Sequence, residues 1–300
     1  MSEEAKSFQK INQSLHQDIS KLWDECFGDL PIMVQRTLKA YALRKNNQAY
    51  THHKHPRITN LDVYKNITVN VDDEHFPPTS IQTQTAQAKV DEIINKMKQG
   101  KSRAARYLRY FLRDKTIKIS VNKSSAYDAG MSGYNPLTKE IYIDLCAGCF
   151  YQSDNPTNLI NEDNLAMTVG HEIAHAVERF NRSSKSKPET ISSNAWEIES
   201  FCDAFGARLA ADAGYSLVPK IEMMQEGINK KREPVQPNPH PPLKNRLEQI
   251  EYMELIFQTK TRSLTLFNDQ ITTLEWDSEK LEKKVWNNLK MLLDKKTPKH

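Results

Sequence analysis

Residues 164–180 of this chain read NLAMTVGHEIAHAVERF. Apolar side chains recur in this stretch at steps of four, four, four and three, which predicts an amphipathic helix with one buried face. These side chains are Leu165, Val169, Ile173, Val177 and Phe180. Because His171 and His175 are four residues apart, they share one face of the predicted helix.

His171, Glu172 and His175 form the pattern H-E-x-x-H. Two imidazoles one helical turn apart can hold a zinc ion, and the glutamate between them can reach a water molecule bound to that ion. The alternative interpretation is a chance occurrence, with two ordinary histidines on a half-buried helix. A further metal-binding residue in the right place would favour the zinc site.

The third ligand of a catalytic zinc ion must come from another part of the chain, because such sites use three protein ligands and leave one position for water. Glu178 and Asn181 stand where the longer metzincin motif has glycine and histidine, so the third ligand must lie further along. Residues 194–213 are predicted to form a helix that ends at Gly214. Glu199 on this helix is the candidate ligand.

The predicted helix has a small, acidic face formed by Glu199, Cys202, Asp203 and Gly206. Small residues let two helices approach closely, and Asp203 would accept a hydrogen bond from the distal nitrogen of a zinc-bound histidine. The alternative is a solvated face, which is what most acidic pairs form. Burying two carboxylates among apolar neighbours requires a cation or hydrogen-bond donors nearby, and H-E-x-x-H supplies that context.

Three segments occur in order along the chain: H-E-x-x-H, then Glu199-x-x-x-Asp203-x-x-Gly206, then His240-Pro241 with Arg246 six residues after the histidine. In this order they resemble the HtpX-like zinc peptidases, the gluzincin family that includes the CAAX prenyl proteases. The resemblance covers residues 105–255. It implies a zinc endopeptidase with one Zn²⁺ per chain and a protein or peptide substrate. The residues implied are the metal ligands His171, His175 and Glu199, the general base Glu172, and the auxiliary catalytic groups His240 and Arg246.

The fold class expected is α+β: a mainly helical, zincin-like metallopeptidase core with a small antiparallel sheet beside the H-E-x-x-H helix. Residues 116–121 and 140–145 are strand-like and are joined by a turn-rich loop. In peptidases of this architecture the strand before the metal-binding helix lies at the sheet edge, where an extended substrate can pair with it. The residues predicted to bind substrate in this way are Tyr142, Ile143, Asp144 and Leu145.

Three regions are expected along the chain: an N-terminal helical region and linker (1–80), the zinc metallopeptidase core (81–258), and a C-terminal hairpin and helix (259–300). Members of the family commonly span a membrane or carry an export signal. This chain has no apolar run approaching the roughly 18 residues that span a bilayer, and its N-terminus lacks the apolar core of a signal peptide. We therefore expect no membrane span, and a protein that is cytoplasmic or exported without an N-terminal Sec signal.

The length and composition agree with a soluble enzyme. A formal net charge of +4 in 300 residues is too small to indicate a nucleic-acid partner, and none is expected. The basic residues 98–113 are interpreted as an amphipathic helix with solvated arginines, although a basic helix with aromatic residues can also bind phosphates. Four cysteines are too sparse for a disulfide framework, and Cys146 and Cys149 are interpreted as free thiols.

Other functions remain open from the sequence. ImmA-type regulatory proteases share H-E-x-x-H and a later Glu-x-x-x-Asn/Asp, and a bacterial effector protease exported without a Sec signal would look similar. An inactive zinc-binding scaffold would keep the ligands, although the intact Glu172 argues against it. A non-enzymatic nucleic-acid binder would require no metal and would bind with strong salt dependence.

Overall fold

The computed structural model describes residues 19–43, 75–123, 130–152, 155–159, 162–183, 195–230 and 240–258. The chain divides into two compact units, Met1–Gln258 and Thr259–His300, and all the described residues belong to the first. The predicted C-terminal hairpin and helix (259–300) and much of the predicted N-terminal helical region and linker (1–80) lie outside the described residues.

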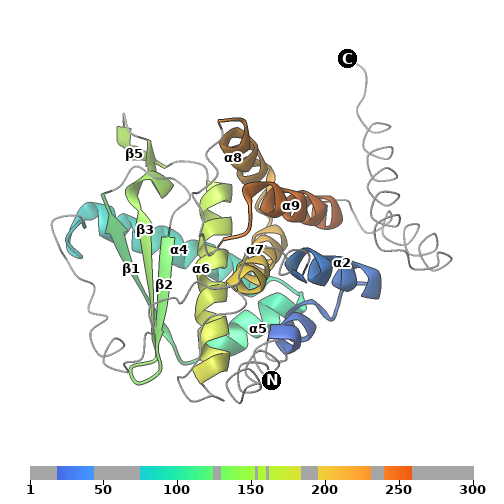
Figure 1. The fold of residues 1–300 in the computed structure, drawn as a ribbon. Helices are drawn as coiled ribbons and strands as arrows, with labels where there is room; N and C mark the ends of the chain where they lie inside the picture. Colours follow the sequence, from blue (N-terminus) through green and yellow to red (C-terminus); the bar gives the residue numbers. More distant parts are fainter. Residues whose placement is uncertain are drawn as a thin grey trace, which may run out of the picture. The chain divides into compact units, whose positions relative to one another are not determined.

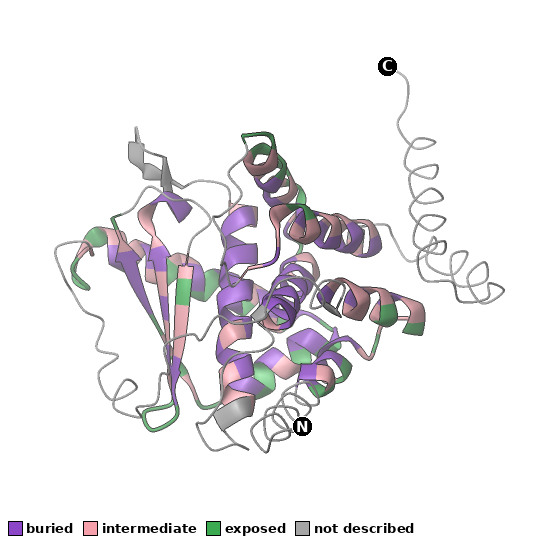
Figure 2. Cartoon of the chain, in the orientation of Figure 1, coloured by how far each residue is buried: buried purple, intermediate pink, exposed green. Residues whose placement is uncertain are grey.

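Helix α6 (Glu162–Ser183) lies at the centre of this unit, with a β-sheet on one side and α7 (Ala195–Asp212) on the other (Figure 1). The predicted apolar face is buried at Leu165, Val169, Ile173 and Val177, which confirms the amphipathic pattern. Figure 2 shows α6 and α7 as the most buried helices of the view. The H-E-x-x-H residues are therefore carried into the interior, and His171 and Glu172 are both buried.

The remaining helices pack around this pair. Their bounds are α2 (Ile32–Leu43), α4 (Ile81–Gln99), α5 (Arg103–Leu112), α8 (Val218–Asn229) and α9 (Leu243–Gln258). A helical segment over residues 19–27 packs Trp23 edge-on against Phe201 of α7, with ring centroids 5.4 Å apart. In α5, Leu108 and Phe111 are buried while the arginines are exposed, as the amphipathic interpretation of residues 98–113 predicted.

The sheet contains β1 (Thr116–Asn122), β2 (Gly130–Asn135) and β3 (Glu140–Cys146) in the order β1-β3-β2. A short 3-10 helix, η1 (Ala147–Cys149), and a second pair of strands, β4 (Tyr151–Gln152) and β5 (Asn155–Leu159), follow β3. Ile141, Ile143 and Leu145 alternate as buried residues along β3, which is the pattern of a sheet with one face on the core.

The expectation of an antiparallel sheet is wrong, because the sheet is mixed. β2 pairs antiparallel with β3, but β1 pairs parallel with β3. The sequence pattern did not predict β2, which lies in the segment expected to be a turn-rich loop between the two predicted strands. The chain reverses into β2 and again into β3, so β1 and β3 run in the same direction. The second reversal is tight, with Asn135 Oδ1 accepting hydrogen bonds from the backbone of Leu137 and Thr138.

The expectation that Tyr142–Leu145 form an edge strand is also wrong. β3 is the central strand, and its backbone pairs with β1 on one side and β2 on the other, so no edge is left for a substrate. The outer edge of β1 is covered by Gln87 of α4, which bonds to Ile119 N at 3.0 Å and to Ile117 O at 3.4 Å. The edge that faces α6 belongs to β2.

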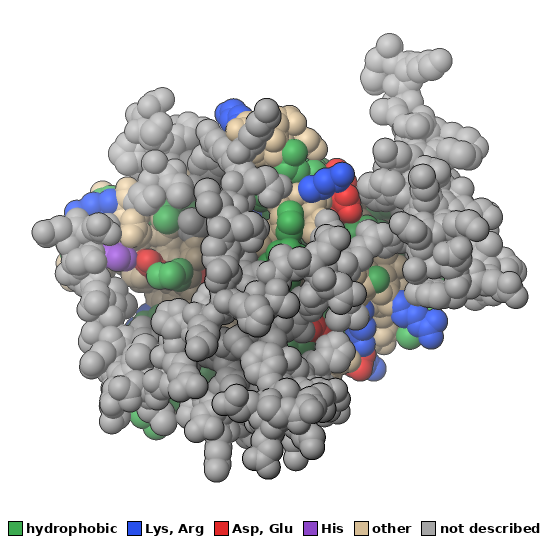
Figure 3. Space-filling view, viewed as in Figure 1, with side chains coloured by type: hydrophobic (Ala, Val, Ile, Leu, Met, Phe, Trp, Pro, Cys, Tyr) green, Lys and Arg blue, Asp and Glu red, His purple; other side chains and the backbone are tan. Residues whose placement is uncertain are grey.

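None of the helices within the described residues has the length and apolar character that crossing a bilayer requires. The described side chains visible in Figure 3 show lysine and arginine dispersed over this face, with acidic side chains between them. The visible described residues therefore form no continuous basic surface.

The backbones of α6 and α7 approach each other closely at two glycines. A Cβ atom added to Gly170 would lie 2.7 Å from Gly206 Cα, and one added to Gly206 would lie 2.6 Å from His171 N. Real Cβ atoms do not make such contacts, so both glycines are required for the helices to pack this closely. The small face predicted for residues 199–206 therefore allows α7 to pack closely against α6.

We predict that Gly206→Ala lowers the free energy of unfolding by about 3 kcal/mol, because overpacking a close contact forces the backbones apart. Gly214→Ala is the control. Gly214 ends α7 with a φ of 86° and has open space around its Cα, so this change should cost about 1–2 kcal/mol of conformational strain. Urea denaturation of the three proteins measures both values. Wild-type stability in Gly206→Ala would contradict the packing described.

Candidate metal centre

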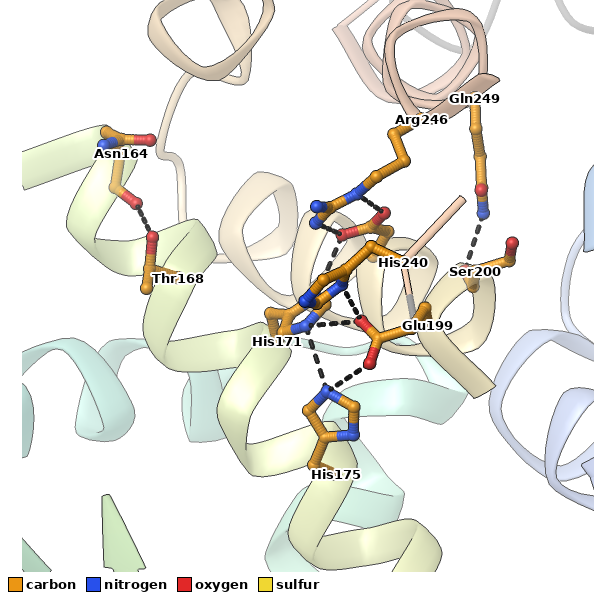
Figure 4. A network of polar contacts seen from close by, with 10 residues as sticks. Asn164, Thr168, His171, His175, Glu199, Ser200, His240, Arg246 and Gln249 are labelled. Atoms are coloured by element: carbon orange, nitrogen blue, oxygen red, sulfur yellow. Dashed lines mark hydrogen bonds and ion pairs between the residues drawn. The ribbon is translucent and has the colours of Figure 1, made fainter. Parts of the chain in front are cut away.

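Helices α6 and α7 bring together three side chains that could hold a metal ion. His171 and His175 point from α6 toward Glu199 of α7, and their ligand atoms all lie within 4.8 Å of one another (Figure 4). His171 and Glu199 are buried, and the side chain of His175 is 14% exposed. The structure thus brings together the three ligands predicted from separate sequence segments.

The ligand atoms face one another at short distances. His171 Nε2 lies 3.1 Å from His175 Nε2 and 3.3 Å from Glu199 Oε2, and His175 Nε2 lies 3.4 Å from Glu199 Oε1. Glu199 Oε2 is buried, and the polar atoms around it include two ring nitrogens, His171 Nε2 at 3.3 Å and His240 Nδ1 at 2.7 Å. A buried carboxylate oxygen in this situation is costly unless a cation lies beside it.

These separations fit a metal ion. Zn–N bonds of 2.0–2.1 Å and Zn–O bonds of similar length give a tetrahedral edge of about 3.3–3.4 Å. The three separations, 3.1, 3.3 and 3.4 Å, are close to that edge. The donor set of two imidazoles and one carboxylate is the one found in gluzincin sites. The group could therefore hold a metal ion without rearrangement.

Asp203 orients the first histidine. Its Oδ1 lies 2.9 Å from His171 Nδ1, and a proton on Nδ1 leaves the Nε2 lone pair for a metal. Arg246 of α9 donates to both oxygens of Asp203, from Nε at 2.7 Å and from Nη2 at 2.8 Å. This two-pronged ion pair satisfies the charge of a carboxylate that is only 1% exposed.

The electrostatics of the centre favour positive charge between its ligands. Burial lowers the pKa of His171, but hydrogen bonds and charges from Asp203 and Glu199 outweigh burial and raise that pKa to about 9. Burial raises the pKa of Glu199, but His171, His175 and His240 outweigh it and hold the pKa well below its usual range. Burial likewise opposes the ionisation of Asp203, and Arg246 and His171 reverse this effect. A metal cation between these residues would balance the carboxylate charge of Glu199, as the proton on His171 does.

His240 lies beside the ligand Glu199, with Nδ1 2.7 Å from Oε2. It precedes α9, and its side chain is 39% exposed, so it borders both the ligand group and solvent. Arg246, predicted as an auxiliary catalytic group, donates hydrogen bonds to both oxygens of Asp203. Arg246 is therefore connected to His171 through Asp203, on the Nδ1 side of the imidazole ring.

Glu172 lies on the side of α6 that faces β2. Its side chain is buried, and a Cβ atom on Gly130 would lie 3.1 Å from Glu172 Oε1. Gly130 therefore leaves the room that the Glu172 carboxylate occupies. The sequence pattern does not predict this role, because Gly130 lies in the segment that is expected to be a turn-rich loop.

The four residues predicted to bind substrate lie elsewhere. Side chains alternate along β3, so Ile143 and Leu145 point into the core. Asp144 lies on the opposite face, where its Oδ1 accepts a hydrogen bond from Ser120 Oγ at 2.6 Å and Oδ2 lies 3.2 Å from His75 Nε2. Tyr142 donates a short hydrogen bond to Glu140 on that face.

Comparisons with protein-family models, with curated proteins and with solved structures found no match for this chain. The description of the centre therefore rests on its own geometry. That geometry shows a buried group of two histidines and one glutamate that could hold a metal ion.

We predict that the purified protein binds one equivalent of divalent metal and that His171→Ala, His175→Ala or Glu199→Ala each abolishes binding, because three ligands are the minimum set. His75→Ala is the matched control, since His75 pairs with Asp144 outside the centre. Elemental analysis after dialysis measures the stoichiometry. Full metal content in Glu199→Ala would remove this residue from the ligand set.

Asp203→Asn tests the orienting hydrogen bond. The amide can donate to His171 Nδ1, which shifts the imidazole proton to Nε2 and weakens metal binding by about 10- to 100-fold. Asp144→Asn is the control, because this carboxylate lies on the other face of the sheet. Competition with a chromogenic chelator measures both affinities. Unchanged affinity in Asp203→Asn would show that the bond does not select the tautomer.

Proposed function

We propose that this protein is a zinc-dependent endopeptidase that hydrolyses peptide bonds of a protein or peptide substrate. The observation that carries the proposal is the convergence of His171, His175 and Glu199 with the buried Glu172 directly beside them. Zinc is the metal proposed, because two imidazoles and a carboxylate suit it and leave a fourth position open.

The reaction assigned to the centre is attack of water on a peptide carbonyl. A zinc ion held by His171, His175 and Glu199 would supply Lewis-acid chemistry, lowering the pKa of water and polarising a carbonyl group. Glu172 would accept the proton of the attacking water and then transfer it to the leaving amine. Gly130, which has no side chain, lies next to the Glu172 carboxylate.

His240 is the residue proposed to stabilise the developing oxyanion. Its ring lies at the rim of the centre and is partly exposed, so a donated hydrogen bond can reach a substrate oxygen. Arg246 is proposed as a positioning residue that acts through Asp203 and His171, because its guanidinium is bound to both oxygens of Asp203.

The substrate strand is proposed to pair with β2 rather than with β3. β2 lies between β3 and α6, and Gly130 at its start is next to the proposed base. An extended peptide added to this edge would pass the ligand group with backbone hydrogen bonds that do not depend on its side chains. This arrangement supports an endopeptidase, since neither end of the peptide needs to be bound.

The resemblance to HtpX-like peptidases is part of the proposal, and so are the alternatives that share its chemistry. A regulatory protease of the ImmA type or an exported effector protease would use the same residues on a single protein substrate. An inactive zinc-binding scaffold would bind metal with the same ligands and cleave nothing. No nucleic-acid partner is proposed.

Glu172→Gln separates metal binding from catalysis. We expect this variant to keep its metal and its stability but to lose about 10²- to 10⁴-fold in peptide cleavage, because an amide cannot accept the proton of water. Cleavage of a peptide mixture with both ends blocked, read by mass spectrometry, measures the loss. Glu222→Gln, on the exposed side of α8, is the matched control.

Metal removal provides the complementary test. Chelation should abolish cleavage, and one equivalent of zinc should restore it in the wild type but not in His171→Ala. Undiminished cleavage by Glu172→Gln, or activity that persists after chelation, would sink the proposed function.

A further inference from the structure

Arg179 is a third polar side chain on the stripe of α6 that carries the two histidine ligands. His171, His175 and Arg179 are spaced by four residues, so Arg179 lies one turn, about 6 Å along the axis, beyond His175. The residue is half-buried. It follows the ligands along α6, away from the end where Gly170 contacts α7.

Arg179 contacts the strand edge beside the metal centre. Its Nη1 donates a hydrogen bond to the carbonyl oxygen of Ser132 in β2. Gly130 is next to Glu172, and Tyr134 packs edge-on against Phe180 at 5.7 Å, so β2 runs alongside α6 from the proposed base to Arg179. A peptide paired with β2 would therefore pass the guanidinium.

Arg179 differs from the other buried or half-buried arginines of the described residues, because their charges are balanced by carboxylates. Arg246 binds both oxygens of Asp203, and Arg208 lies 3.2 Å from Asp212 and 3.3 Å from Asp29. No carboxylate lies within ion-pair distance of Arg179 among the described residues. Its one hydrogen bond uses one of five N–H donors. The N–H donors that remain along the edge of the planar guanidinium can bind both oxygens of a carboxylate.

We propose that Arg179 is a specificity-determining residue that binds a carboxylate of the substrate, one helical turn beyond the metal ligands. The inference rests on the proposed peptidase function. The carboxylate belongs to an acidic side chain or to the C-terminus of the peptide, since both present the same pair of oxygens. A neutral amide at the same position lacks the charge and one of the acceptors, so the site discriminates between the two.

The experiment compares peptides that differ only in this group. A cleaved peptide, found in the end-blocked mixture, is resynthesised with Glu or Gln at each position on either side of the cleaved bond. A second pair has a free C-terminal carboxylate or a C-terminal amide at the same distance. The wild type should prefer one carboxylate over its amide by about 10- to 100-fold in kcat/KM, and the pair that shows the preference identifies its source.

The variants test whether Arg179 causes the preference. Arg179→Gln should lower kcat/KM for the acidic peptide alone and bring the ratio to within about twofold of one, while Arg179→Lys should keep part of it. Arg106→Gln, an exposed arginine of α5, is the matched control and should keep the wild-type ratio. Metal content and melting temperature are measured on the same preparations.

Binding of the same peptides to Glu172→Gln, followed by fluorescence polarisation, separates this inference from the proposed function. Loss of the carboxylate preference on adding Arg179→Gln supports the inference even if cleavage proves to come from another protein. A wild type without any preference, a preference that survives in Arg179→Gln, or an equal loss for acidic and amide peptides would overturn it. The last result would show that Arg179 only ties β2 to α6.

Discussion

The contact between Gly170 and Gly206 is the constraint on which the rest of the structure depends. It lets the backbones of α6 and α7 touch, with a Cβ position on Gly206 only 2.6 Å from the amide nitrogen of His171. Glu199 and Asp203, two turns and one turn earlier on α7, then reach the histidine ring from either side. Any larger residue at the contact would separate the helices and with them the ligand atoms.

The second constraint is charge. Two carboxylates are buried between α6 and α7, and neither is tolerated there without compensation. Arg246 compensates Asp203 directly, and Asp203 in turn fixes the nitrogen that His171 presents. Among the described residues, the imidazole rings of His171, His175 and His240 face Glu199. A divalent cation at this point would complete the balance, and this is why the proposed function begins with metal.

The sheet determines how a substrate would approach. Because β1 pairs with β3 and has its outer edge bonded to Gln87, the only sheet edge beside α6 in the described residues is that of β2. Gly130 and Ser132 of this strand contact Glu172 and Arg179, respectively. The proposed base and the proposed carboxylate-binding arginine thus lie along one line, which the order of residues in α6 by itself does not reveal.

The sequence by itself determined the local features of this protein. The spacing of apolar residues predicted α6, and H-E-x-x-H together with Glu199-x-x-x-Asp203 predicted the three ligands and the orienting carboxylate, because helical periodicity converts spacing into a shared face. Only the tertiary structure decided the strand pairing and the contacts of Gly130, Arg179 and Arg246. The physical reason is that these features depend on which backbone edges and side chains meet across long stretches of chain. Periodicity reports which face of an element is buried, but not which neighbour covers it.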